Sequence, residues 1–228
     1  MFIALITARG GSKGLPKKNT LLLNNKPVIS WTIEAALQSS SIDRVYVSTE
    51  DDEIKKLCSN YNVEIIDRPL HLASDEASSE EVIWHAYQYF ATNRVPVETV
   101  ALLQPTSPLR VARDIDSAYE EYIKNDARMV VSVFEPSQSP AKAYILNGNG
   151  QLTGLYNSQA PYERRQDLPL AYQPNGAIYI FSSKEFARER KLPKRMVFPY
   201  IMSQSDSIDL DTYNDLKQIE RRLEEREC

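Results

Sequence analysis

Short apolar runs alternate along most of the chain with helix-like segments. The strand-like runs are residues 2–8, 44–49, 63–66, 99–104, 129–134, 177–181 and 196–201. The helix-like segments are residues 28–38, 52–61, 79–92, 114–124 and 213–226. Strands that alternate with helices in this way indicate βαβ units around a mostly parallel, buried sheet. The predicted fold class is therefore α/β, with three layers and a mostly parallel (mixed) central sheet.

This alternation stops between residues 135 and 175. The stretch is rich in Pro, Gln, Asn and Gly, and the sequence NGNG at Asn147–Gly150 is a hairpin signal. About 40 residues without the α/β pattern are too many for a plain loop in a compact domain. We therefore predict one domain over residues 1–228 with an inserted arm at 135–175. The tyrosines of the arm suit a buried interface, so we expect a dimerisation element rather than a disordered linker.

Composition excludes several classes of protein. The formal net charge is −4 and 42% of residues are apolar, which is ordinary for a globular protein and argues against nucleic acid as a partner. Cys58 and Cys228 are the only cysteines, which supports neither a disulfide framework nor a zinc site and favours a reducing, cytoplasmic setting. The sequence has neither a signal peptide nor an apolar run of roughly 20 residues, so no membrane partner is expected.

The sequence ARGGSKGLPKKN at residues 8–19 contains four cationic residues and no acid, although the chain as a whole is acidic. The first acid of the chain is Glu34. The stretch is neither of two common phosphate motifs: Arg9 replaces a glycine of G-x-G-x-x-G, and Leu15 and Pro16 break a Walker A loop. Its glycines still let backbone N–H groups approach a phosphate, and it follows the first strand, where α/β sheets bind ligands. We therefore predict a nucleotide-binding fold, with an ordinary glycine-rich turn as the alternative.

This loop closely resembles the signature loop of the CMP-acylneuraminate synthetases, the cytidylyltransferases that activate sialic acids. The resemblance covers nearly the whole chain through further motifs in the same order. These are DRPLHLASDEASS, LLQPTSPLR, ERRQDLP, NGAIYIF and SIDLDTYNDL. It implies one nucleotidyltransferase domain, CTP and an acidic nine-carbon sugar (N-acetylneuraminic acid or a close analogue) as substrates, pyrophosphate as a product, Mg²⁺ as cofactor, and a cytoplasmic homodimer.

The resemblance also implies residue roles on the nucleotide side. The expected nucleotide-binding residues are Arg9, Ser12, Lys13, Asn19, Arg68 and Ser79. Arg9 and Lys13 are expected to be catalytic, because cations there stabilise charge that moves to the leaving pyrophosphate. Lys17 and Lys18 are expected to add only long-range attraction. The alternative for Arg68 is a surface ion pair with Asp67 or Asp75.

Asp209 and Asp211 lie two residues apart in an expected extended segment, so both carboxylates face one side. Such a pair suits a hard divalent cation bridged to phosphate oxygens. The resemblance favours both as Mg²⁺ ligands, with Asp211 also catalytic, since it or a metal-bound water would help to deprotonate the sugar hydroxyl. The alternative makes Asp211 only the N-cap of the last helix.

Four residues are expected to bind the sugar. Gln104 ends an apolar strand at the carboxyl edge of the sheet, where a polar side chain can meet a hydroxyl group. Arg165, in the arm, is the candidate for the sugar carboxylate, acting across the dimer. Tyr179 and Phe181 could line the N-acyl pocket, and core packing is the alternative for both.

Other activities fit parts of the same pattern. Legionaminic, pseudaminic or Kdo-type sugars would use the same chemistry. A metal-dependent glycosyltransferase also has an Asp-x-Asp pair, although usually after a strand in mid-chain. A non-catalytic nucleotide-binding relative is the third alternative, and it is disfavoured because the loop cations, Gln104 and both aspartates are all present.

Overall fold

The computed structural model describes residues 1–12 and 14–227, without the side chain of Glu227. Its main element is a seven-stranded sheet in the order β11-β7-β10-β6-β1-β4-β5. The strands are β1 (Phe2–Thr7), β4 (Arg44–Thr49), β5 (Glu64–Asp67), β6 (Thr99–Leu103), β7 (Met129–Phe134), β10 (Gln173–Ser182) and β11 (Val197–Ile201). Strand β10 is antiparallel to β6 and β7, and the other neighbours pair in parallel, so the predicted mixed and mostly parallel sheet is confirmed.

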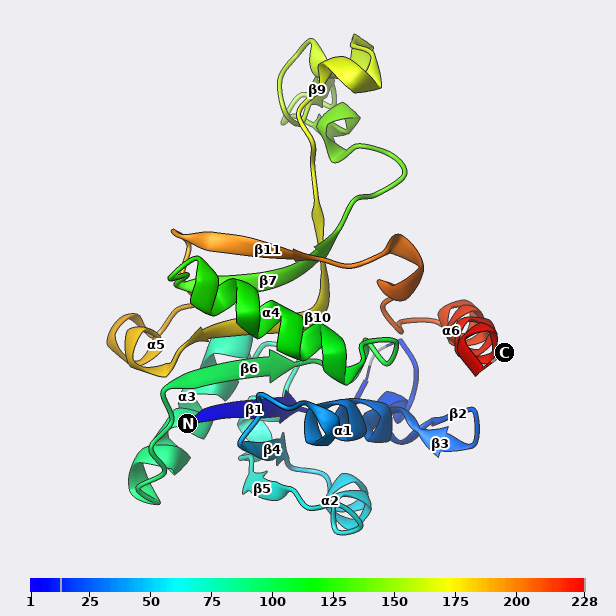
Figure 1. Cartoon of the computed structure of the whole chain (residues 1–228). Coiled ribbons are helices and arrows are strands. Elements are labelled where there is room, and N and C mark those ends of the chain that lie inside the picture. The colour runs from blue at the N-terminus through cyan, green and yellow to red at the C-terminus, as the bar shows by residue number, and fades with distance from the viewer. Residues whose placement is uncertain (13, 228) are drawn as a thin grey trace.

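Helices cover both faces of this sheet (Figure 1). Helices α1 (Val28–Gln38), α2 (Asp52–Cys58) and α4 (Ala112–Lys124) pack on one face, and α3 (Ser79–Thr92) and α5 (Ser183–Glu189) pack on the other. Helix α6 (Tyr213–Glu227) packs with the segments that follow β1 and β6. The three-layer prediction is therefore confirmed.

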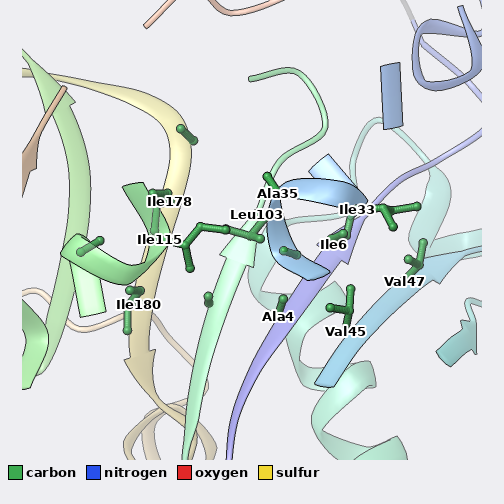
Figure 2. Packing of buried hydrophobic residues seen from close by; sticks show 14 of the residues in the cluster. Ala4, Ile6, Ile33, Ala35, Val45, Val47, Leu103, Ile115, Ile178 and Ile180 are labelled. Carbon is green, nitrogen blue, oxygen red and sulfur yellow. The ribbon is translucent and has the colours of Figure 1, made fainter. Parts of the chain in front are cut away.

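Strand β1 explains why the sheet needs two covering layers. Ala4 and Ile6 face α1 and α4 in the cluster of Figure 2, whereas Ile3 and Leu5 face α3. All four side chains are fully buried. Each buried Ile or Leu contributes about 1.5–3 kcal/mol relative to exposure, so an apolar run of this kind is stable only between two layers.

Most predicted elements were correct in type and position. Strand β4 and helices α1 and α3 have the predicted bounds. The predicted helix at 52–61 ends earlier, at Cys58, and the side chain of Asp51 caps its start by accepting a hydrogen bond from the amide of Ile54. Helix α5 was not predicted, because its seven residues are too few for a helical apolar period and only Phe186 anchors it in the apolar core.

The arm lies between β7 and β10 and projects away from the sheet (Figure 1). It contains a hairpin of β8 (Tyr144–Leu146) and β9 (Leu152–Gly154), which confirms the NGNG signal. Three short 3₁₀ helices accompany the hairpin: η3 (Pro140–Lys142), η4 (Ala160–Tyr162) and η5 (Arg165–Asp167). Residues 173–175, predicted to belong to the arm, are already part of β10.

The topology brings several polar loops to one edge of the sheet. Strands β1, β4, β5 and β6 run in the same direction, so the segments after Thr7, Thr49, Asp67 and Leu103 all leave at their carboxyl ends. This is the edge at which open α/β sheets bind ligands. A short hairpin of β2 (Leu22–Leu23) and β3 (Lys26–Pro27) follows the first of these segments. Among the described residues, no helix combines the length and apolar character needed to cross a membrane.

Candidate active site

A polar cleft of about 280 Å³ opens at this carboxyl edge. It brings together six of the residues predicted from the sequence, although they come from four separate segments of the chain. These are Arg9, Ser12, Asn19, Arg68, Ser79 and Gln104. Lys13, the remaining one of the six residues predicted for the nucleotide side, lies outside the described residues. The cleft therefore contains five of the residues predicted to bind the nucleotide and one residue, Gln104, predicted to bind the sugar.

Side chains from elsewhere in the fold hold the basic loop in place. The amide of Gly10 donates to Oε1 of Glu50 at 2.7 Å. Asn19 is buried, and its Nδ2 donates to the carbonyl of Arg9 at 2.8 Å. Arg68 donates to the carbonyl of Ala8. These contacts fix the loop backbone before any ligand binds, which is the preorganisation that an anion site requires.

Arg68 and Glu50 form a buried ion pair beneath the loop. Nη2 of Arg68 lies 3.1 Å from Oε2 of Glu50, and both side chains are at least nine-tenths buried. The alternative of a surface ion pair with Asp67 or Asp75 is wrong, because the guanidinium points inward to Glu50 at the end of β4. Burial lowers the pKa of Arg68, and the Glu50 carboxylate opposes that shift. Glu50 was missed from the sequence because nothing in its local pattern marks it as polar and buried.

The cations of the loop are neutralised by acids that are distant in sequence. Arg9 pairs with Asp75 at 2.8 Å, Lys17 with Glu53 at 2.7 Å, and Lys18 with Asp211 at 2.9 Å. The lack of acids before Glu34 therefore does not leave the loop unscreened. An incoming polyanion would have to compete for these cations with carboxylates already in place.

Lys18 has a larger role than the sequence suggested. Its side chain is only 14% exposed and lines the cleft, whereas that of Lys17 is 71% exposed and turns to Glu53 outside the cleft. The sequence predicted long-range attraction alone for Lys18, whereas its side chain lines the cleft and pairs with Asp211. The difference arises because Lys17 adopts a left-handed conformation with φ of 54° and η1 (Lys18–Thr20) follows it.

The two aspartates near the C-terminus approach the loop from the other side. Leu210 between them is fully buried, and Asp209 and Asp211 are exposed, as an extended segment requires. A Cβ on Gly14 would lie 2.6 Å from the carbonyl oxygen of Asp211, so only glycine allows this approach. The segment therefore packs directly against the basic loop.

Asp211 is not the N-cap of α6, so that alternative is wrong. Thr212 takes this position: its Oγ1 accepts from the amide of Asp215, and Oδ2 of Asp215 accepts from the amide of Thr212 at 2.7 Å. This reciprocal pair satisfies the start of the helix. The Asp211 carboxylate remains available to Lys18 and to a ligand.

The donor set around Asp209 and Asp211 fits a magnesium ion. Desolvation raises the pKa of Asp209, a hydrogen bond from Thr106 opposes this, and the charge of Asp211 raises it further. A divalent cation between two such carboxylates would relieve their repulsion. The described residues contain no group of three or more His, Cys, Asp or Glu side chains arranged for a metal. Mg²⁺ ordinarily needs only one or two carboxylates, with phosphate oxygens and water as its other ligands.

Of Gln104 and Tyr179, only Gln104 is among the residues that line the cleft, and Tyr179 packs against the core cluster on the α3 face of the sheet. Gln104 lines the cleft, and a Cβ on Gly176 would lie 2.7 Å from its Oε1. Tyr179 is partly buried on β10, and burial together with the charge of Asp209 raises its pKa. Tyr179 is therefore within electrostatic range of the acidic pair.

Two residues predicted for the sugar lie elsewhere. Phe181 is fully buried and packs on Phe186 of α5, with ring centroids 5.6 Å apart. It belongs to the core, because its position on β10 directs it between the sheet and α5. Arg165 lies in the projecting arm, pairs with Glu135 at 3.1 Å, and does not line the cleft of its own chain.

A buried polar network behind the cleft escaped the sequence analysis. Asn175 is buried, its Oδ1 accepts from Ser132 at 2.6 Å, and its Nδ2 donates to Ser207 at 2.9 Å. Arg110 is also buried and donates to the carbonyls of Gln104 at 3.3 Å and Ala177 at 3.0 Å. These contacts connect the ends of β6 and β10 to the segment that carries Asp209. Only the motif NGAIYIF could have indicated Asn175.

Comparisons with known proteins identify the family to which the chain belongs. A sequence model of the family described as cytidylyltransferase matches residues 3–227. The chain is 35% identical over 93% of its length to the N-acylneuraminate cytidylyltransferase of Streptococcus agalactiae serotype V, and it spans 51% of that protein. It is therefore about half the length of the N-acylneuraminate relatives that it matches.

Two further relatives match from end to end. The CMP-N,N'-diacetyllegionaminic acid synthase of Legionella pneumophila is 34% identical, with 97% of this chain and 96% of that protein covered. The pseudaminic acid cytidylyltransferase of Campylobacter jejuni is 32% identical, with 94% and 93% covered.

The fold also has solved counterparts. The structure of CMP:2-keto-3-deoxy-manno-octonic acid synthetase complexed with CTP superposes with a TM-score of 0.72 at 18% identity and covers 99% of both chains. At this identity the likeness shows the fold alone. The match to the family model over nearly all residues, together with relatives covered from end to end, shows that the chain belongs to the cytidylyltransferase family.

Proposed function

We propose that this chain transfers the cytidylyl group of CTP to the hydroxyl of an acidic nine-carbon sugar, N-acetylneuraminic acid or a close analogue, and releases pyrophosphate. The observation that carries the proposal is the cleft at the carboxyl edge. There the basic loop, Arg68 and Gln104 line one space, and the Asp209–Asp211 segment adjoins it through the contacts of Asp211 with Lys18 and of Asp209 with Thr106. A glycosyltransferase is not supported, because the matching family is that of the cytidylyltransferases.

The nucleotide would lie between the basic loop and the start of α3. Ser12, Asn19, Arg68 and Ser79 line this part of the cleft, and their polar atoms can bind the base, the ribose and the phosphates. Arg9 would leave Asp75 in part and turn toward the triphosphate. Exchange of a carboxylate for a phosphate partner keeps the guanidinium paired throughout binding.

The chemistry requires stabilisation of charge on the leaving pyrophosphate. Arg9, Lys13 and Lys18 would supply it. Arg9 and Lys18 line the cleft, and the loop backbone at Arg9 and Gly10 is held before the reaction by the contacts of Asn19 and Glu50. Asp211 would accept the proton of the sugar hydroxyl as that oxygen attacks the α-phosphate. Its ion pair with Lys18 orients this carboxylate.

Asp209 and Asp211 are the residues that would hold Mg²⁺. When bound, the ion would neutralise phosphate charge and align the triphosphate for in-line attack. Asp209 would remain a ligand while Asp211 faces the sugar, since the two carboxylates lie on the same side of an extended segment.

The sugar would bind between Gln104, Tyr179 and the arm of a second chain. The arm exposes a large apolar surface for its size, which a homodimer would cover. Its exposed apolar residues include Tyr144, Leu146, Leu152, Tyr156 and Tyr162. Arg165 lies in the same arm, and in a dimer it could offer a bidentate partner to the sugar carboxylate of the neighbouring site.

Legionaminic or pseudaminic acid is the specific alternative for the sugar substrate. The relatives covered over nearly their whole length include a legionaminic acid synthase and a pseudaminic acid cytidylyltransferase, whereas the N-acylneuraminate relatives named above are about twice as long. Both sugar classes would use the same cleft and the same leaving group. The buried free thiol of Cys58 agrees with the proposed cytoplasmic setting.

The test is pyrophosphate release with CTP, Mg²⁺ and a panel of acid sugars: N-acetylneuraminic, legionaminic, pseudaminic and Kdo. The proposal expects release with at least one nine-carbon sugar, and identification of the CMP-sugar by mass. Absence of release with every sugar, from protein that binds CTP, would leave a non-catalytic nucleotide binder instead.

A further inference from the structure

A second and larger cavity, of about 820 Å³, lies beside the cleft. It shares only Leu72 and Ser78 with the cleft lining, and its other walls come from η2 (Leu70–Ala73), from α3 and from the segment after α5. None of the residues assigned above to CTP, sugar or metal lines it. Its volume is within the range of about 300–1,000 Å³ that is typical of small-molecule sites.

Three cations form one wall of this second cavity: Arg190, Lys191 and Lys194. Within the described part of the chain, none of them makes an ion pair. The nearest acids on the opposite wall are Glu80 and Glu81, at the start of α3. Glu81 is already engaged, because it accepts hydrogen bonds from the amide and hydroxyl of Ser78 at 2.7 and 2.9 Å.

The remaining wall is apolar and aromatic. Trp84 lies along it, with the guanidinium of Arg190 4.1 Å from the centre of the ring. Leu72 and Pro69 extend this surface. His85 also lines the cavity, and its Nδ1 is buried without a hydrogen-bond partner among the described residues. The cavity thus combines unpaired positive charge, an aromatic surface and an unsatisfied polar atom.

We propose that this cavity binds a small organic phosphate that carries a planar ring, as a site separate from the catalytic cleft. The phosphate would pair with Lys191 and Lys194, which are free to reach it. The ring would pack on the Arg190 guanidinium, which lies over Trp84, because Tyr87 already stacks on the Trp84 ring with centroids 5.2 Å apart. A simple inorganic anion would use only the charged wall, and an uncharged ring would use only the apolar wall.

The wall that the two spaces share couples ligand binding in this cavity to the catalytic cleft. Segment 69–78 borders both spaces, and it holds Arg9 through the carbonyl of Ala73 at 3.2 Å and the carboxylate of Asp75 at 2.8 Å. A ligand that moves Leu72 would therefore shift the groups that hold Arg9. By linkage, such a ligand and the nucleotide in the cleft alter each other's affinity by the same factor.

The binding test uses Trp84 as a reporter. Trp31→Phe leaves Trp84 as the one tryptophan, since the chain has two. Adenosine diphosphate is titrated into this protein while its fluorescence is followed, with pyrophosphate and adenosine as the ring-free and charge-free probes. We expect adenosine diphosphate to bind at least about tenfold more tightly than either, a difference of about 1.4 kcal/mol.

Variants then locate the site. Lys191→Ala/Lys194→Ala should weaken adenosine diphosphate at least about tenfold, and Lys124→Ala/Lys217→Ala, which removes the same charge elsewhere, should not. Lys18→Ala, on the cleft side, should also leave this titration unchanged. The proposal is overturned if the probe gives no saturable signal, if pyrophosphate binds equally well, or if Lys18→Ala abolishes the signal while the double lysine variant retains it. None of these outcomes depends on cytidylyl transfer.

The coupling has its own measurement, which rests on the proposed function. Saturating adenosine diphosphate should change the KM for CTP at least about threefold in the parent protein but not in Lys191→Ala/Lys194→Ala. Equal KM values with and without the probe, in a protein whose Trp84 signal is saturated, would overturn the coupling while leaving the site itself in place.

Discussion

Lys18 and Asp211 form an ion pair of 2.9 Å between residues 193 positions apart in sequence. It connects the end of the basic loop to the acidic segment before α6, across the mouth of the cleft. Asp211 is 66% exposed, so the pair contributes little to stability. The pair matters because it positions both side chains: Lys18 for the proposed leaving group and Asp211 for the sugar hydroxyl.

The first prediction concerns this lysine. Lys18→Met should lower kcat/KM for CTP about 100-fold, as loss of a preorganised transition-state donor does. The free energy of unfolding should change by less than about 1 kcal/mol, because the pair is partly exposed. Lys17→Met is the matched control, since its partner Glu53 lies outside the cleft, and it should retain activity within about twofold. Equal losses in both variants would contradict a specific role for Lys18.

The second prediction concerns the buried pair beneath the loop. Glu50→Gln leaves the Arg68 charge buried without a counter-ion, which should cost about 3–5 kcal/mol in the free energy of unfolding. Glu53→Gln removes the same charge from an exposed pair and should cost less than about 1 kcal/mol. Urea unfolding of the two variants measures the difference. If the two costs are the same, the Arg68–Glu50 pair does not hold the loop.

The third prediction concerns Gly176. Its φ is 74°, and a Cβ there would lie 2.7 Å from Oε1 of Gln104, so Gly176→Ala strains the backbone and displaces that amide. We expect the KM for the sugar to rise at least about tenfold with a smaller change for CTP. Gly150→Ala is the control, because Gly150 has φ of 73° but nothing within 4 Å of its added Cβ. It should reproduce the strain without the change in KM.

The fourth prediction concerns stability in acid. Desolvation alone would raise the pKa of Asp116, but hydrogen bonds from Ser39, Ser40 and Ser41 lower it below its ordinary value of 3.8. A depressed pKa stabilises the folded state above the unfolded value, and this contribution is lost as pH falls through the lower, folded value.

Asp116→Asn should therefore lower the free energy of unfolding by about 1–3 kcal/mol at pH 7 and flatten its fall between about pH 5 and pH 2. Asp52→Asn, on an exposed first turn, should keep the parent pH profile. An unchanged acid limb in Asp116→Asn would show that other carboxylates control it.

The fold followed from the sequence because its signals are local. Alternating apolar runs and helix caps lie within a few residues of the elements that they specify, as with Ser78 and Glu81 at α3. Helix α5 has no such period, and its place depends on Phe186 meeting Phe181 in the finished core. The same contact explains why Phe181 was misassigned: alternation on a strand identifies a face but not what covers it.

The candidate site followed only in part. The motifs indicated which polar residues converge on the cleft, and the parallel topology indicated where. The pairs Arg68–Glu50 and Lys18–Asp211 could not be predicted, because each joins two loops whose separation depends on the whole sheet. The sequence alone therefore overstated the unneutralised positive charge of the basic loop, because the acids that pair with its cations lie after residue 50.

The last prediction tests whether the arm completes a neighbouring site. Arg165 is exposed in the arm, which projects away from its own cleft, and Asp211 lies at the cleft of the same chain. Arg165→Ala and Asp211→Ala should each be nearly inactive alone. When the two variants are mixed and allowed to exchange subunits, a heterodimer has one site with both substitutions and one with neither. Random exchange should then restore about a quarter of the parent activity, because half of the dimers are mixed and each has one intact site.

Two controls make this result decisive. Recovery of untagged Asp211→Ala subunits together with tagged Arg165→Ala subunits shows whether subunits exchange, and sedimentation shows whether the variants are dimeric. Arg164→Ala, whose side chain pairs with Asp167 in the same turn of the arm, should stay active alone. If exchange is complete and the mixture recovers nothing, each chain builds its site from its own residues, and Arg165 acts within its own arm or not at all.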